Sequence, residues 1–113
     1  MPVSVVTTQS FLTAAKKLLK KYPSLKADLA VLEAQLLAKP DAGTPLGQNA
    51  FKIRLAIRSK GRGKSGGARV ITHLETVVLT DEAMQTVSLL YLYDKADTAS
   101  ISQRELEDFI RNR

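Results

Sequence analysis

The 113-residue chain contains no cysteine, no tryptophan and a single histidine. The absence of cysteine excludes disulfides and thiolate metal sites, and one histidine argues against a structural zinc site. No stretch approaches the ~20 apolar residues that cross a membrane. The first residues, MPVSVVTTQSF, lack the basic start and the apolar run of a secretory signal. We therefore expect a cytoplasmic protein that uses no metal and no other cofactor.

The length fits one domain with one hydrophobic core, so we expect residues 1–113 to form a single unit. Apolar residues recur at helical spacing in some segments and alternate in others, which predicts an α+β fold. We expect an N-terminal helical hairpin and a C-terminal helix, both packed on a twisted antiparallel sheet.

Charge is distributed unevenly along the chain, whose net charge is +6. Residues 51–69 contain seven Lys or Arg and no Asp or Glu, whereas residues 70–113 contain four basic and eight acidic side chains. Cationic charge concentrated on one segment favours a polyanionic partner, most plausibly a nucleic acid. The alternative is that these charges only keep a loop solvated.

The basic charge lies in a predicted β-hairpin, Phe51 to Leu74. From Phe51 to Arg58 apolar and polar residues alternate, which predicts a strand with a core face and a cationic face. The next residues, 59–67, include four glycines and no large apolar side chain, which predicts a solvated loop. The strand pattern then resumes at Arg69.

The remaining elements follow from caps and periodicity. Val3 to Thr7 predicts a short edge strand. Two helices should follow, one capped by Thr8 or Ser10 and ended by Pro23, the next capped by Ser24 and closed before Lys39. Residues 41–48 and 80–86 read as turns, Val87 to Tyr93 as a central strand, and Ser102 with Glu105 as the capping box of a last helix.

Several familiar catalytic patterns are absent or incomplete. Gly63, Lys64 and Ser65 suggest a phosphate-binding loop, but the required earlier glycine is replaced by Arg58 and no helix is expected to follow. His73 could act as a general base or be an ordinary strand residue. No serine has a recognisable base beside it, so acyl transfer has no support.

RNA phosphodiester cleavage fits the residues that are present. The 2′-hydroxyl attacks the adjacent phosphorus, and the protein must position it, neutralise the phosphoryl oxygens and move a proton. Arginine binds phosphate oxygens, and a phenol can stack on a base. A lysine among other cations has a lowered pKa and can therefore act as a general base. A sheet could bring together the candidates of these types: Lys52, Arg54, Arg69, Tyr93 and Lys95. Alternatively, the basic residues only hold phosphates or a protein partner while Tyr93 belongs to the core.

The segment AFKIRLAIRSKGRGKSGGARVI, followed by an apolar strand ending in YDK, resembles the RelE/ParE toxin superfamily, specifically RelE/HigB-type toxins of type II toxin–antitoxin systems. The resemblance covers most of the chain and implies ribosome-dependent cleavage of mRNA. It also implies a cognate antitoxin and operator DNA bound by the toxin–antitoxin pair. Many relatives carry a catalytic tyrosine near the C-terminus, whereas residues 96–113 contain none.

By position, the resemblance places the family's basic pair on Lys52 and Arg54, its phosphate-stabilising arginine on Arg69, and the end of its last strand on Tyr93, Asp94 and Lys95. We expect the hairpin loop to grip ribosomal RNA through Arg58, Lys60, Arg62 and Lys64. Two other functions remain open: gyrase inhibition, as in the ParE branch, and nucleic-acid binding without cleavage.

Overall fold

The computed structural model describes residues 2–61, 67–98 and 100–113. The elements follow in the order β1 (Val3–Thr7), α1 (Gln9–Lys21), α2 (Leu25–Ala38), β2 (Thr44–Gly47), β3 (Ala50–Leu55), the short 3₁₀ helix η1 (Arg58–Lys60), β4 (Ala68–Leu79), β5 (Glu82–Asp94) and α3 (Gln103–Arg111). The predicted α+β class with its N-terminal helices and C-terminal helix is confirmed. Residues Arg62 and Lys64 of the basic loop lie outside the described residues.

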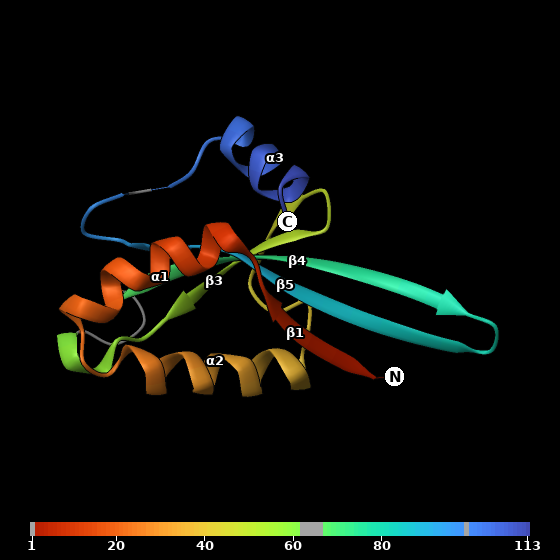
Figure 1. The fold of residues 1–113 in the computed structure, drawn as a ribbon, viewed down its shortest axis with the longest axis horizontal. Helices are drawn as coiled ribbons and strands as arrows, with labels where there is room; N and C mark the ends of the chain where they lie inside the picture. The colour runs from red at the N-terminus through yellow and green to blue at the C-terminus, as the bar shows by residue number, and fades with distance from the viewer. Residues whose placement is uncertain (1, 62–66, 99) are drawn as a thin grey trace.

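One five-stranded sheet has the strand order β1-β5-β4-β3-β2 (Figure 1). Strands β2 to β5 pair antiparallel, as expected, and β1 adds a parallel pairing with β5, so the sheet is mixed. Parallel pairing needs a long connection. Here the helical hairpin and the strands β2 to β4 lie between β1 and β5 in the sequence.

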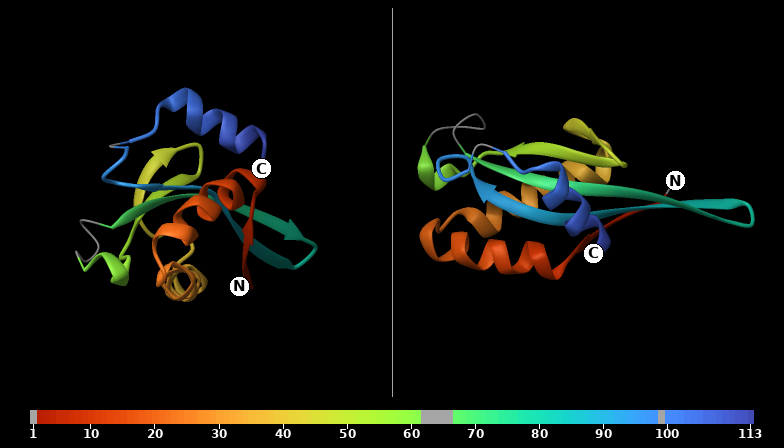
Figure 2. Two further views of the ribbon diagram at one scale, coloured as in Figure 1. Left: turned by 60° about the vertical axis from the view of Figure 1, so that its left-hand side comes forward. Right: turned by 90° about the horizontal axis from the view of Figure 1, so that it is seen from above.

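Helices cover both faces of the sheet (Figure 2). On one face α1 and α2 bury a core that includes Phe11, Leu32 and Leu36 from the helices and Ile53 and Val70 from the strands. On the other face α3 packs Leu106 against Ile71, Leu90 and Tyr93. The alternation of β3 therefore sends Ile53 to the α1/α2 core and its basic residues to the α3 face, as the sequence predicts.

The predicted helix starts are confirmed, with one change of detail. Thr8 caps α1 by accepting a hydrogen bond from the Phe11 amide, and Ser102 forms the capping box of α3 with Glu105. Ser24 precedes α2, but its hydroxyl donates to the Asp28 carboxylate at 2.7 Å instead of capping the helix. None of the described helices is long and apolar enough to cross a membrane.

Two predicted turns were assigned too broadly. Residues 44–47 form the edge strand β2, which tolerates Pro45 because an edge strand does not need every amide. Residues 82–86 belong to β5, and only Thr80 and Asp81 turn the chain. This mostly polar stretch forms a strand because β4, and β1 at Gln85 and Thr86, supply its backbone pairing.

The outer halves of β4 and β5 form a ribbon that projects beyond the body of the protein (Figure 2). The two strands stay paired from Leu74 opposite Val87 to Leu79 opposite Glu82, while β3 reaches only as far as His73. We refer to residues 74–87 as the β4–β5 ribbon.

Candidate functional site

A row of three predicted site residues crosses the sheet. Arg54 on β3 lies directly opposite Arg69 on β4, and Arg69 lies opposite Tyr93 on β5. Residues opposite each other in antiparallel strands project from the same face. Tyr93 packs in the cluster under α3, so the row lies on the α3 face. We call Arg54, Arg69 and Tyr93 the arginine–tyrosine row.

The two arginines of this row place two positive charges on neighbouring strands of one sheet face. Arg54 is exposed, whereas Arg69 is 6% exposed and donates a hydrogen bond from Nη1 to the Ala68 carbonyl at 3.0 Å. An anion bound beside both guanidinium groups would be attracted by both charges, and a phosphodiester has the oxygens that arginine binds best.

Tyr93 lies deeper than base stacking would require. Tyr93 is 4% exposed. Burial raises the pKa of its phenol above the usual value, and nearby Arg69 partly offsets this increase. Its hydroxyl is buried and has no hydrogen-bond partner among the described residues. Tyr93 is therefore a protonated phenol, suited to donating a hydrogen bond near Arg69 and not to stacking on a base.

The two predicted lysines flank the row. Lys52 lies two residues before Arg54, on the same face, and lines a small cavity with Leu46 and Leu106. Lys95 is exposed directly after β5, and its amide donates to the Gly67 carbonyl at 3.3 Å. Only glycine fits at position 67, since a Cβ there would lie 2.1 Å from the Leu55 carbonyl oxygen. Close packing of this backbone brings the end of β5 to the basic hairpin.

The loop residues expected to grip RNA differ in their availability. Lys60 forms a buried ion pair with Asp94, in which Nζ lies 2.7 Å from Oδ1, and its side chain is only 9% exposed. This position does not match the expectation of a solvated phosphate contact. Arg58 bonds Asp28 through Nε at 3.0 Å, yet 67% of its side chain is exposed. Arg58 therefore keeps donors that an RNA could reach.

Asp94 is the centre of a buried network that sequence reasoning did not single out. Besides Lys60, it accepts hydrogen bonds from the Tyr22 hydroxyl at 2.5 Å and the Ala96 amide at 2.9 Å. Burial alone would raise the pKa of Asp94, but the hydrogen bonds from Lys60, Tyr22 and Ala96 outweigh it and lower the pKa to about 2. The network connects η1, the end of α1 and the end of β5, and so holds the basic hairpin beside Lys95.

His73 lies at a distance from the arginine–tyrosine row. It is four residues beyond Arg69 on the same strand, a separation of about 13 Å in extended backbone. Burial lowers its pKa, and Arg113 adds to this effect while Glu75 opposes it. Its position gives no support to a role as the general base of chemistry at Arg69. Among the residues that the structure describes, no cluster of His, Cys, Asp and Glu could hold a metal ion.

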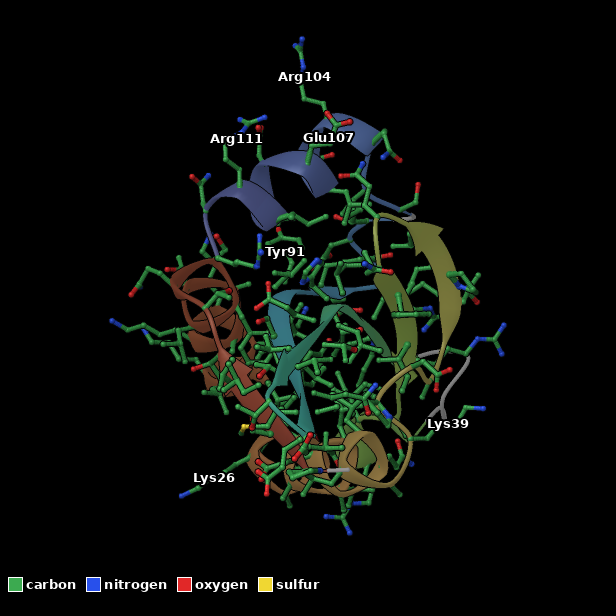
Figure 3. The ribbon with its side chains drawn as sticks, turned by 90° about the vertical axis from the view of Figure 1, so that its right-hand side faces the viewer. Lys26, Lys39, Tyr91, Arg104, Glu107 and Arg111 are labelled. Carbon is green, nitrogen blue, oxygen red and sulfur yellow. The ribbon has the colours of Figure 1, made fainter. Side chains whose placement is uncertain are left out.

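A cavity of about 550 Å³ lies between α1, the end of β5 and α3, and Tyr93 and Asp94 from the predicted end of the last strand line it. Sequence reasoning missed its other aromatic residues, Tyr91 and Phe109, whose rings stack with centroids 4.5 Å apart. Figure 3 shows Tyr91 beneath α3, toward the side where α1 lies. The available signal was the spacing of Tyr91 and Tyr93, which places both rings on one strand face.

Comparison of the chain with protein-family models, curated proteins and solved structures found no match.

Proposed function

We propose that this protein is a ribosome-dependent mRNA endonuclease that acts as the toxin of a type II toxin–antitoxin pair in the cytoplasm. The observation that carries the proposal is the direct opposition of Arg54 and Arg69 within a segment free of acidic residues. Two guanidinium groups on one sheet face offer several hydrogen-bond donors to the oxygens of a phosphodiester. The sequence resemblance supplies the substrate class.

In the proposed reaction, the 2′-hydroxyl of the substrate attacks the adjacent phosphorus and the 5′-oxygen of the next nucleotide leaves. Arg69 and Arg54 neutralise the charge that develops on the phosphoryl oxygens. Lys52 or Lys95 assists proton transfer. Tyr93 lies opposite Arg69 with its hydroxyl buried, so it supports the row without contacting the substrate. The exposed part of Arg58 contacts ribosomal RNA, and a cognate antitoxin covers this face in the inactive pair.

The first prediction concerns Arg54→Ala and Arg69→Ala. Loss of one guanidinium at a developing oxyanion costs on the order of 10²–10³ in rate, so either substitution should remove the cuts that the wild-type protein makes in translated mRNA. Primer extension on a reporter mRNA after brief induction measures this directly. Arg54 is exposed, so its variant should fold even if replacement of buried Arg69 destabilises the protein.

Arg104→Ala is the matched control, because Arg104 points away from the sheet on the outer side of α3 (Figure 3) and its removal changes the net charge equally. Cuts by the control but not by the two row variants would support the site. Undiminished cutting by a folded Arg69→Ala protein would refute it. Intact mRNA in growth-arrested cells with DNA damage would instead favour gyrase inhibition, and intact mRNA with normal growth would favour binding without cleavage.

A further inference from the structure

The 550 Å³ cavity lies beside the part of β5 that does not pair with β1. Strand β1 pairs with β5 only from Gln85 to Leu89, and Thr8 closes this pairing by donating to the Leu89 carbonyl. Beyond Leu89, α1 takes the place of β1 beside the strand, with α3 above it. The cavity is as large as typical small-molecule sites and shares Tyr93 with the arginine–tyrosine row.

A stacked pair of aromatic rings forms part of the cavity wall. Tyr91 and Phe109 stack at an interplanar angle of 18°, both are half-buried, and both line the cavity. Aromatic side chains in such positions bind unpaired bases by stacking, at roughly 1–3 kcal/mol per base. This wall is better placed for a base than the buried ring of Tyr93.

The cavity is also lined by one acidic and one basic side chain that could contact a nucleotide. Asp97 lies on the linker to α3, and Lys17 projects from α1 on the other side; both are exposed and both line the cavity. A carboxylate accepts hydrogen bonds from an exocyclic amino group such as N4 of cytosine, whereas uracil has a carbonyl oxygen at that position. Lysine is suited to the phosphate.

We propose that this cavity binds one unstacked nucleotide of the RNA substrate, with its base on the outer face of the Tyr91–Phe109 pair and an exocyclic amino group donating to Asp97. The inference rests on the proposed RNA substrate and assigns a base preference to the same face of the protein. Bases with an exocyclic amino group, namely cytosine, adenine and guanine, bind there in preference to uracil.

The test is an NMR titration of the isolated protein with cytidine and uridine 5′-monophosphates. The two nucleotides carry the same ribose and phosphate, so their difference isolates the exchange of an amino group for a carbonyl. Cytidine monophosphate should shift the backbone amide signals of Tyr91, Asp97 and Phe109 and bind roughly tenfold more tightly than uridine monophosphate.

Two variants separate the parts of the site. Asp97→Ala should bring the two affinities within about twofold of each other, because the acceptor is gone. Phe109→Leu should weaken both about fivefold or more through loss of stacking. Asp81→Asn, at the exposed turn between β4 and β5, is the control and should change neither affinity.

Equal affinities in the wild type, or shifts confined to the basic hairpin, would overturn the inference even if mRNA is cut. Discrimination that depends on Asp97, without any cutting of mRNA, would retain the nucleotide site and refute the nuclease. The two proposals therefore fail separately.

Discussion

At the residue scale, the ion pair between Asp94 and Lys60 is the most consequential contact. Both side chains are almost fully buried, so each compensates for the desolvation of the other. A lysine in a loop without acidic residues is expected to be a solvated charge. Lys60 is buried only because the end of β5 brings Asp94 beside it. The sequence therefore shows that the loop is basic but not that Lys60 is buried in an ion pair.

Asp94→Asn should destabilise the fold by about 3 kcal/mol at neutral pH, because Lys60 would remain buried without its counter-charge. The measurement is chemical denaturation of the wild type and the variant. Asp108→Asn provides the control, since it removes a carboxylate from the exposed pair with Arg111 and should change stability little.

The difference in stability between wild type and Asp94→Asn should depend on pH in a defined direction. The folded-state pKa of Asp94, about 2, lies below the value of 3.8 expected when unfolded. The corresponding stability, about 2 kcal/mol, is present above pH 4 and is lost as the pH falls toward 2. The difference in free energy of unfolding between wild type and Asp94→Asn should therefore decrease as the pH falls from 4 to 2. A gap that stays constant from pH 5 to 2 would show that Asp94 titrates normally.

At the element scale, α3 depends on its own first turn. It has nine residues, too few to be stable alone, and it buries Leu106 fully against the sheet while Phe109 stacks on Tyr91. The capping box satisfies two backbone donors at its start, with the Glu105 amide 3.1 Å from the Ser102 hydroxyl and the Ser102 amide 3.0 Å from Glu105. Because Phe109 of this helix lines the 550 Å³ cavity, the cap supports the proposed nucleotide site indirectly.

Ser102→Ala should lower the free energy of unfolding by about 1 kcal/mol through loss of the cap. Thermal denaturation followed by circular dichroism measures the change. Ser100→Ala, which removes the same hydroxyl from the linker before the helix, should leave the transition within a fraction of that shift. Equal effects of both substitutions would mean that the cap does not stabilise α3.

At the scale of the whole molecule, charge and burial divide the protein into two ends. The basic hairpin and Lys95 lie at one end, whereas the β4–β5 ribbon extends from the other (Figure 1) and has three acidic residues and no basic one. The ribbon also exposes large apolar side chains, including Val78, Leu79 and Met84. Its residues from Thr76 to Met84 belong to neither hydrophobic core, whereas the same strands nearer the body are covered on both faces.

Amides from Thr76 to Ala83 should consequently exchange with solvent at least ~100-fold faster than those of Val70 and Leu90, since no packed core opposes local opening of the ribbon. Hydrogen exchange followed by mass spectrometry or NMR tests this at two protein concentrations. Protection of the ribbon equal to that of the core would contradict the prediction, and protection that rises with concentration would indicate association between copies.

The sequence by itself determined the features that depend on local chemistry: the helix caps at Thr8 and Ser102, the alternation of β3 and the continuous apolar stretch of β5. It also determined the concentration of basic residues and the absence of thiolate sites. These follow from neighbours along the chain, so no distant contact can change them much. The order of the elements and the α+β class could be predicted on the same basis.

Only the tertiary structure decided which distant residues meet. The opposition of Arg54, Arg69 and Tyr93 depends on strand register, and a slip of one residue would send each side chain to the other face. The burial of Lys60 on Asp94, the parallel pairing of β1 and the stacking of Tyr91 on Phe109 likewise join segments far apart in the sequence. Such contacts are set by how the helices and the sheet fill space together, and no local pattern encodes them.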